Sequence, residues 1–476
     1  MQFAREINRL IVGILVLFFA VALGSAYWAI FGPDTILKRQ DNPRLVEVEA
    51  AIRRGSIYDR NETLLVQSTI GDSNRITRQY LYPSMSSAIG YASLRYGVSG
   101  AESAFNTILR GDTRPTDLAS QLVGNLLHRP QVGLDVRLSF DLQIQSEAVR
   151  AMGDHRGAVV LLEVPSGAVL SMVSLPTYDP NTLDQNWVEL TQAPGNPFFN
   201  RVLLGTYQPG TTLQTPLMAA AILAKYPLAT TYEDAAGAVE VADVRFECLQ
   251  QPTTTSLSLV DAYILGCPEP FVQLVQDLGV NTTKTAFDTF QLDELPTLAS
   301  YVTVPASTDT ITSQFELNSQ NLIENTLGQG EISVSPLEMV LLAAAIQNDG
   351  NAPTPYVLLG YRDPELTSWQ TEPSNRVTLP MMTSDTAHEL HRIMRRAVLE
   401  GAAQAANIEP IEIGGQVALA YAGESSQAWF IGFASLSSQS KVAIAVVIED
   451  TSNTDEAARI ARQIFIAAQQ EYASGN

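Results

Sequence analysis

Residues 158–173 read AVVLLEVPSGAVLSMV, and this stretch decides the fold. Two runs of Val, Leu and Ala flank the turn sequence Pro165-Ser166-Gly167, which predicts two buried β-strands joined in a hairpin. Near the end of the chain, residues 429–434 (WFIGFA) and 442–448 (VAIAVVI) flank a Ser-rich turn and predict a second hairpin. A sheet is therefore expected to begin near Gly157, with further strands close to the C-terminus.

Ala- and Leu-rich runs lie between the two hairpins. Residues 212–225 (TLQTPLMAAAILAK) and 337–346 (LEMVLLAAAI) have the composition of helices buried in a core. Pro216 is tolerated only close to a helix start, so the first helix is expected to begin near Thr211. An amphipathic helix over residues 456–472 follows the second hairpin. Strands at both ends with helices between them predict an α+β layer fold.

The N-terminal region carries a long apolar run. Residues 10–33 (LIVGILVLFFAVALGSAYWAIFGP) contain no charged residue and are long enough to cross a bilayer as a helix. Arg5 and Arg9 precede the run, which favours a cytoplasmic tail over residues 1–9 and an outward-facing remainder, although two basic residues just after the run weaken the asymmetry. A cleaved signal peptide is the alternative; the run is longer than a usual signal-peptide core. We expect a single-pass membrane anchor.

Composition limits the domains and ligands that the chain can have. A chain of 476 residues with 46% hydrophobic content has room for two or three domains, and we expect a small α+β pedestal over residues 40–150 before a larger domain over residues 151–476. The net charge of -21 argues against nucleic acid as a partner. The two cysteines and four histidines form no grouping typical of a metal or haem site, so no metal and no cofactor are expected.

Several motifs in a fixed order resemble those of one protein family. Residues 200–201 (NR) and 207–214 (YQPGTTLQ) are similar to Asn-Arg and Tyr-x-Pro-Gly-Ser-Thr-Phe-Lys, the active-site segment of class B penicillin-binding proteins. Further stretches resemble other elements of that family in the same order: 54–61 (RGSIYDRN, with Glu62 where Gly is usual), 328–330 (GQG), 334–338 (VSPLE) and 428–433 (AWFIGF). Ordered matches over nearly all of the outer chain are more specific than any one of them alone.

The resemblance implies a fold, a location and a chemistry. The fold would be a penicillin-binding, serine β-lactamase-like transpeptidase domain, an antiparallel sheet flanked by helices, on a smaller α+β pedestal and anchored in the bacterial cytoplasmic membrane. Its members are serine acyl-transferases that crosslink peptidoglycan stem peptides. That chemistry uses a lysine three residues after the serine as a base, because the two side chains share one helix face. It also uses a Ser-x-Asn loop and a Lys-Thr-Gly strand that bind substrate and move protons.

The first motif departs from the family pattern at both catalytic positions. Thr211 stands at the nucleophile position and Gln214 at the position of the lysine. Threonine retains a hydroxyl, but threonine nucleophiles are activated by an amine, and a carboxamide is not a base.

The other two motifs depart as well. Gly266 and Pro268 stand where the Ser and Asn of Ser-x-Asn belong, and Gln416, Val417 and Ala418 stand where Lys-Thr-Gly belongs. The strand character of the third motif is kept while its cation and its hydroxyl are lost. Because members of a catalytic unit act together, we predict that the transpeptidase body has been kept without its chemistry.

The two cysteines lie around the second motif. The family often has a cysteine pair at this loop, and an outward-facing domain lies where disulfides can form, so the resemblance implies a bond between Cys248 and Cys267. Closing a loop of this length would contribute about 3 kcal/mol. Two isolated buried thiols are the alternative.

Three functions remain open from the sequence. The first is a catalytically inactive scaffold of cell-wall synthesis that binds a stem peptide or a membrane partner, such as a glycan-polymerising glycosyltransferase. The second is an active transpeptidase or carboxypeptidase with Thr211 as nucleophile. The third is a sensor that binds wall fragments or β-lactams without acylation. The sequence does not distinguish a role in cell shape from one in division.

Overall fold

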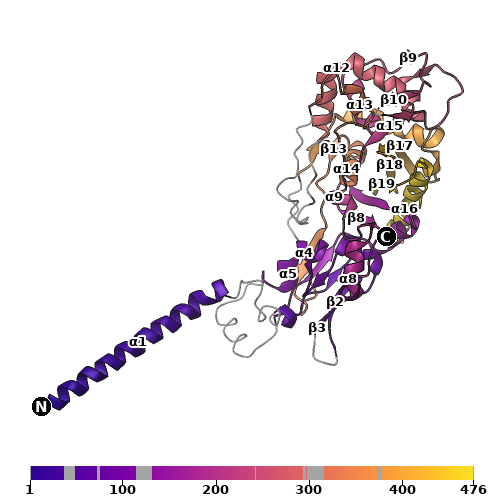
Figure 1. Cartoon of the computed structure of the whole chain (residues 1–476). Coiled ribbons are helices and arrows are strands. Elements are labelled where there is room, and N and C mark those ends of the chain that lie inside the picture. Colours follow the sequence, from indigo (N-terminus) through magenta and orange to yellow (C-terminus); the bar gives the residue numbers. More distant parts are fainter. Residues whose placement is uncertain are drawn as a thin grey trace.

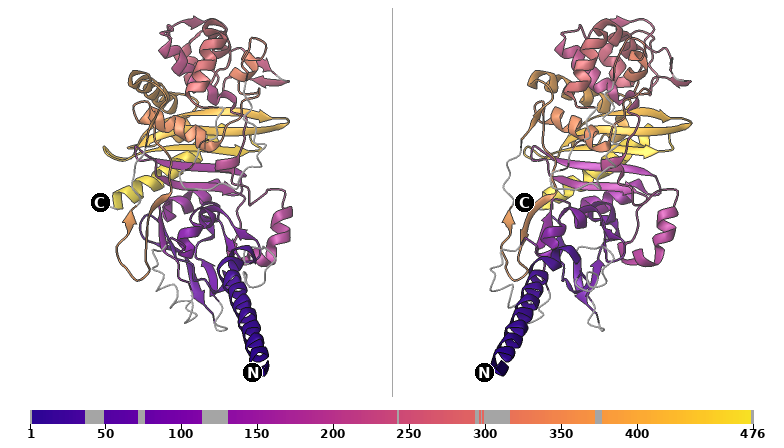
Figure 2. Two further views of the ribbon diagram at one scale, coloured as in Figure 1. Left: turned by 90° about the vertical axis from the view of Figure 1, so that its left-hand side faces the viewer. Right: turned by 60° about the vertical axis from the view of Figure 1, so that its left-hand side comes forward.

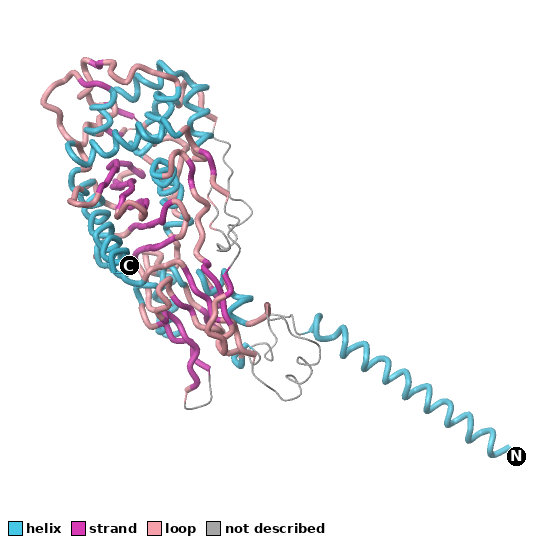
Figure 3. Tube along the Cα trace, turned by 180° about the vertical axis from the view of Figure 1, so that it is seen from behind, coloured by secondary structure: helices cyan, strands magenta, loops and turns pink. Residues whose placement is uncertain are grey.

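The computed structural model describes residues 2–36, 49–71, 76–113, 131–241, 243–292, 296, 298, 316–371 and 377–474. A long N-terminal helix, a smaller domain and a larger domain follow one another (Figure 1). Two separate groups of strands, one in each domain, are visible from behind in Figure 3. The strand and helix layers of both domains agree with the α+β class predicted from the sequence.

The larger domain is built on a five-stranded antiparallel sheet. Its order is β17-β18-β19-β7-β8, so the two predicted hairpins lie side by side and β19 pairs with β7. Both predicted hairpins are confirmed, and β17 adds a third C-terminal strand at the edge. The bounds are β7 (Gly157–Val164), β8 (Val169–Leu175), β17 (Glu412–Ala422), β18 (Ser425–Ser435) and β19 (Lys441–Glu449).

Helices cover both faces of this sheet (Figure 2). The C-terminal helix α16 (Thr454–Ser474) packs on β18 and β19 beside α7 (Leu142–Met152), and α14 (Pro336–Gln347) packs on β19 and β7. The residues between the two ends of β19 are all buried, as expected for a strand covered on both sides. The side chains of Ser335 and Glu338 form a capping box at the start of α14. The Ser-Pro-Leu-Glu element therefore acts as the N-terminal cap of this helix.

A group of helices lies beyond the sheet edge formed by β17. The helix predicted over residues 212–225 begins as a 3-10 turn, η3 (Gly210–Leu213), and continues as α10 (Gln214–Leu223), with Pro216 in its first turn. It packs against α12 (Glu269–Thr289) and α15 (Ser384–Glu400); α13 (Leu322–Thr326) lies on α12, and α11 (Leu259–Leu265) lies on α15. Short strands border this group: β9 (Thr231–Tyr232), β10 (Val239–Val241), β11 (Val244–Phe246), β12 (Leu257–Ser258), β13 (Asn351–Ala352) and β16 (Leu379–Pro380).

The smaller domain, here called the pedestal, contains a six-stranded sheet made from two distant parts of the chain. Its order is β15-β14-β6-β1-β2-β3, and β14 and β15 return to it from beyond the sheet of the larger domain. The bounds are β1 (Ile57–Tyr58), β2 (Leu64–Ile70), β3 (Ile76–Tyr80), β6 (Asp135–Leu138), β14 (Leu358–Arg362) and β15 (Gln370–Thr371). Around it lie η1 (Pro83–Met85), α3 (Ser86–Ile89), β4 (Ala92–Ser93), β5 (Gly97–Val98), α4 (Gly100–Ala104), α5 (Asn106–Arg110), η2 (Pro180–Thr182) and α8 (Leu183–Gln192).

The RGSIYDRN stretch lies at the centre of the pedestal. A Cβ atom at Gly55 would lie 1.8 Å from the carbonyl oxygen of Leu134, so glycine is required by this close approach. Arg54 and Arg78 both bind the fully buried carboxylate of Glu102, with N–O distances of 2.7 Å. This charged cluster fixes β3 and α4 against the start of the domain.

The N-terminal helix α1 (Gln2–Ile36) contains the predicted apolar run. Its segment Ile7–Ser25 has a mean hydropathy of 2.3 and no buried residue, and among the described residues it is the one helix long and apolar enough to cross a membrane. It fits a single-pass membrane anchor.

Candidate functional site

The first motif is held in a tight turn against strand β17. Gly210 has φ of 55°, and a Cβ atom there would lie 2.2 Å from the carbonyl oxygen of Leu419, so the Pro-Gly sequence allows η3 to approach the strand. Thr211 follows in η3 and is only 2% exposed. Its Oγ1 accepts a hydrogen bond of 3.3 Å from the amide of Leu419. The hydroxyl thus lies in the closed seam between η3 and β17.

Gln214, the first residue of α10, connects the first motif to the other two. Its Nε2 donates to the carbonyl oxygen of Cys267 at 3.2 Å, and its Oε1 accepts from Nε2 of Gln416 at 3.3 Å. The side chain is 1% exposed. The three motif segments, far apart in the sequence, therefore meet at this amide.

Gln416 reaches this amide from β17. Its Nε2 also donates to the carbonyl oxygen of Thr211 at 2.9 Å, and its Oε1 accepts from the hydroxyl of Thr215. The hydroxyls of Thr215 and Tyr263 are 2.8 Å apart and hydrogen-bonded to each other. We call the side chains of Gln214, Thr215, Tyr263 and Gln416 the amide cluster. All four are buried.

The second motif forms the turn between α11 and α12. Gly266 ends α11 in the left-handed conformation, with φ of 66°, and Pro268 precedes the first residue of α12. Neither supplies a side chain that can exchange a proton. The contribution of this turn to the amide cluster is the backbone carbonyl of Cys267.

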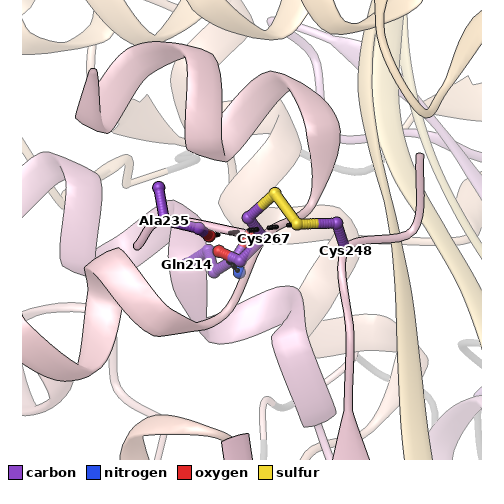
Figure 4. The surroundings of a disulfide bond; sticks show 4 residues. All are labelled: Gln214, Ala235, Cys248 and Cys267. Carbon is purple, nitrogen blue, oxygen red and sulfur yellow. Dashed lines mark hydrogen bonds between the residues drawn. A yellow bond between two sulfur atoms is a disulfide. The ribbon is translucent and has the colours of Figure 1, made fainter. Parts of the chain in front are cut away.

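A disulfide joins Cys248 to Cys267 next to the amide cluster (Figure 4). Figure 4 shows the side chain of Gln214 directed at the carbonyl of Cys267, and the sulfur of Cys248 near the carbonyl of Ala235. Both cysteines are buried. The bond fixes the turn that presents the acceptor to Gln214.

The remaining positions of the third motif belong to the interior of the sheet. Val417 pairs with Phe430 and Ala418 with Trp429 across β17 and β18. Both side chains are buried and apolar. They keep the strand in place and offer no hydroxyl or charge.

The amide cluster contains no ionised group. Among the described residues, no Lys, Arg, His, Asp or Glu side chain makes a hydrogen bond with Thr211, Gln214 or Gln416. Burial raises the pKa of Tyr263 well above its usual range, so its phenol stays neutral. The cluster can hold three segments together by hydrogen bonds, but two carboxamides and two neutral hydroxyls cannot act as a base toward Thr211.

A second group of charged residues, centred on Glu449, lies at the Asn-Arg element, which precedes η3 in the chain. Asn200 caps α9 (Arg201–Leu204), and Arg201 binds Glu449 at 2.8 Å. Tyr207 and Arg156 bind the same carboxylate at 2.9 and 2.8 Å. Burial alone would raise the pKa of Glu449, but the hydrogen bonds and charge of Arg201, with Arg156 and Tyr207, lower it. This cluster positions the segment that leads into η3.

Sequence reasoning missed three members of the site. Thr215 and Tyr263 join the amide cluster, and the amide of Leu419 binds the hydroxyl of Thr211. Thr215 directly precedes the apolar part of a helix predicted to be buried, and a polar residue there was the available sign of a buried partner. Nothing in the sequence marked a backbone amide. In the residues described, no group of three or more His, Cys, Asp and Glu is placed to hold a metal ion.

Comparison with known families agrees with the fold and with the motif order. Residues 157–467 match the penicillin binding protein transpeptidase domain, and residues 54–136 match the penicillin binding protein A dimerisation domain. The chain therefore belongs to the penicillin-binding protein transpeptidase family.

Individual relatives include D,D-transpeptidases of cell-wall synthesis. The chain is 27% identical to the peptidoglycan D,D-transpeptidase PbpA of Mycolicibacterium smegmatis, over 94% of each chain. The PbpA of Mycobacterium tuberculosis is also 27% identical over 94% of each. The crystal structure of the M. tuberculosis protein superposes with a TM-score of 0.76, covering 88% of this chain and 99% of that one. The chain is a PbpA-like homologue of cell-wall synthesis proteins.

Proposed function

We propose that this protein is a membrane-anchored scaffold of cell-wall synthesis whose transpeptidase body does not catalyse acyl transfer. The observation that carries the proposal is the amide cluster. It occupies the positions where the family motifs place their lysines, and it contains hydrogen-bonding groups without a base.

The chemistry of acyl transfer supports this proposal. Serine-type acyl transfer needs a group that removes the proton of the nucleophile, and Gln214 and Gln416 have no such capacity. Removing one member of a catalytic unit typically lowers kcat by about four to six orders of magnitude, and the losses do not add independently. Replacement of both lysine positions by neutral amides therefore leaves no acid–base pathway that resembles the family mechanism.

The burial of the nucleophile position supports the proposal independently. Thr211 is 2% exposed, and its Oγ1 lies against the backbone of β17. An acyl donor would have to separate η3 from β17 and break the hydrogen bond of Gln416 to the carbonyl of Thr211. The neutral cluster thus holds closed the seam that a substrate would need to enter.

The membrane arrangement belongs to the same proposal. Arg5 and Arg9 before the apolar segment of α1 favour an outward-facing body. From there the pedestal and the larger domain could contact a stem peptide or a membrane partner, such as a glycan-polymerising glycosyltransferase. A penicillin binding protein A dimerisation domain match over residues 54–136 makes the pedestal the place to look for such a contact.

Covalent labelling by a fluorescent penicillin tests the absence of acylation. The full chain in detergent should show no labelled band, and Thr211→Ala should give the same result. The PbpA of M. tuberculosis, for which a penicillin G acyl-enzyme structure is known, serves as the positive control. A labelled band that disappears in Thr211→Ala would overturn the proposal.

A binding measurement separates a scaffold from a sensor. Isothermal titration of the full chain with a purified muropeptide should show no heat of binding if the body acts only through protein partners. Saturable muropeptide binding without acylation would instead show that the body recognises wall peptide, as a sensor of wall fragments would.

A further inference from the structure

The outer edge of β3 borders a groove in the pedestal. β3 is the last strand of its sheet, and β2 is its one paired neighbour in the sheet order of the described chain. The groove has a volume of about 720 Å³. Its walls are β3 and the segments 49–54, 92–98 and 180–184. β3 and the start of α8 lie near each other at this end of the molecule (Figure 1).

Part of this edge has open backbone groups. The amide of Leu81 donates to the carbonyl of Leu65 at 3.0 Å, so the alternation of an antiparallel ladder directs the N–H and C=O groups of Tyr80, Arg78 and Ile76 away from β2. At Tyr80 the side chain of Asn181 satisfies both groups, with two hydrogen bonds of 2.9 Å. Asn181 thus takes the place of a strand there, and within the described part of the chain no partner satisfies the outward N–H and C=O groups of Arg78 and Ile76.

A buried cation lies beside the open edge. The side chain of Arg78 is 8% exposed and lines the groove, and its buried Nη2 has no hydrogen-bond partner among the residues that the structure describes. The carboxylate of Glu102 binds both Arg78 and Arg54, and the nearby carboxylate of Asp135 pairs with Arg362, so two negative charges face three positive charges. The other carboxylates of the groove have partners of their own: Glu49 binds Arg110 and Asp184 accepts from Ser93.

We propose that this groove binds an extended segment of another protein, which adds as a seventh strand at β3 and places an acidic side chain opposite Arg78. Strand addition would satisfy the open groups of Arg78 and Ile76. A carboxylate opposite Arg78 would balance the excess positive charge of this cluster. Because Nη2 is buried in the free protein, a hydrogen bond to it requires the guanidinium to shift toward the edge.

The pleat of the sheet sets the pattern of the bound segment. Residues two apart on a strand face the same side, so the side chain opposite Ile76 lies two positions from the acidic one. Ile76 is apolar and half-buried, and an apolar residue fits there. The residue between them faces the side of Thr77 and Gln79, which is exposed and polar. The bound segment should therefore contain an acidic residue and an apolar residue that are separated by one polar residue.

A second copy of this chain fits the groove less well. The β3 of a copy would present Ile76 and Arg78 but no carboxylate, which would leave the excess positive charge beside Arg78 unbalanced in both copies. The net charge of -21 also opposes self-association at low salt. This interaction does not depend on the catalytic state of the larger domain, and its test is separate from penicillin labelling.

Two labelled peptides test the proposal on the full chain in detergent. The first is fluorescein-Ser-Val-Thr-Glu-Thr-Val-Ser, which has Val two positions from Glu in both chain directions, and the second replaces Glu by Gln. Fluorescence anisotropy should show that the Glu peptide binds about tenfold more tightly than the Gln peptide, because a charged hydrogen bond is lost. Hydrogen exchange at Ile76 and Arg78 should slow when the Glu peptide is added.

A proline at the edge provides the decisive variant. Ile76→Pro removes an N–H that makes no bond to β2 and puts a ring at the edge, so peptide binding should disappear while the melting temperature stays close to that of the parent. Ile76→Val is the matched control and should bind as the parent does. The proposal is overturned if neither peptide binds to the parent chain. It is also overturned if Ile76→Pro binds the Glu peptide as tightly as the parent chain does. Self-association of the parent chain that Ile76→Pro abolishes would assign the edge to a homodimer and would also overturn it.

Discussion

Two buried polar clusters of this protein each join distant segments of the chain, one through charged side chains and the other through neutral ones. In the pedestal, Arg54 and Arg78 surround the carboxylate of Glu102, which is fully buried. In the larger domain, Gln214 and Gln416 join segments that are 202 residues apart, and every group is neutral. The first cluster depends on matched charges and the second on matched hydrogen bonds. Charge has been retained where it holds the architecture together, and it is absent where the family places its chemistry.

The difference has energetic consequences. Removing one partner from a buried ion pair leaves an uncompensated charge, which costs more than an unsatisfied neutral group. A neutral cluster tolerates the loss of one hydrogen bond better, but it has no way to stabilise a new charge. Removing a partner should therefore lower the free energy of unfolding more in the charged pedestal cluster than in the neutral amide cluster. Introducing a charge should destabilise the amide cluster.

The largest effect is expected for Glu102→Ala. The change leaves two buried guanidinium groups without their carboxylate, and the free energy of unfolding should fall by about 3 to 5 kcal/mol. Urea unfolding followed by circular dichroism measures this. Glu456→Ala is the matched control, because its pair with Arg459 is partly exposed to solvent and should contribute less than about 1 kcal/mol. Equal losses of unfolding free energy for the two substitutions would show that the buried ion pairs of Glu102 stabilise the protein no more than a surface pair does.

A lysine restored at the first motif should destabilise the larger domain. Gln214→Lys puts an ammonium group among buried neutral partners, and we expect a loss of about 2 to 4 kcal/mol together with a lowered pKa of the new amine. Penicillin labelling should not appear, because Thr211 stays buried. Gln214→Met, which adds no charge, is the comparison variant. Stability equal to that of the parent, together with covalent labelling, would show that the site accepts a base.

A smaller effect is expected for Gln416→Leu. The change keeps the side-chain volume but leaves the carbonyl of Thr211 and Oε1 of Gln214 without their donor, which costs about 1 to 3 kcal/mol. Combining it with Gln214→Leu should cost less than the sum of the two single changes, since their shared hydrogen bond is lost only once. Strict additivity in a double-mutant cycle would argue against a coupled cluster.

The smallest effect is a pH dependence of the stability that the Glu102 carboxylate contributes. Burial alone would raise the pKa of Glu102, but Arg78 and Arg54 lower it below its ordinary value of 4.5. Because the pKa is lower in the folded state, the carboxylate contributes stability above about pH 4.5, and this contribution is lost as the pH falls through the folded value.

Melting curves of the parent and Glu102→Gln check this dependence. The difference between their melting temperatures should be constant from pH 5.5 to 7 and should shrink below about pH 4.5. The corresponding difference for Gln416→Leu should not change with pH, because no group of the amide cluster titrates there. A pH-independent difference for Glu102→Gln would contradict the assigned pKa.

Much of the fold could be predicted from the sequence because its signals are local. The hairpins around Pro165 and Ser437, the buried helix with Pro216 near its start and the apolar segment of α1 each follow from patterns within a short window. The return of β14 and β15 to the pedestal sheet had no such signal. Their pairing with β6 joins residues more than 200 positions apart, and several sheets could accept two short strands.

The candidate site was predicted only as a set of positions. The order of the motifs predicted that Thr211, Gln214 and Gln416 belong to one site, and their side-chain chemistry shows that none of them is a base. Which groups would satisfy these buried amides could not be predicted. The partners include a backbone carbonyl at Cys267 and the hydroxyls of Thr215 and Tyr263, which no motif marks.

The sequence by itself determined the local elements, the apolar anchor segment and the absence of a lysine at two motif positions, since hydrophobic periodicity and side-chain chemistry are properties of the chain. Only the tertiary structure decided how these positions are filled. Packing of η3 against β17 brings Gln416 within hydrogen-bond distance of Gln214 and buries Thr211. Such contacts depend on the mutual placement of elements distant in sequence, and that placement is set by the core as a whole.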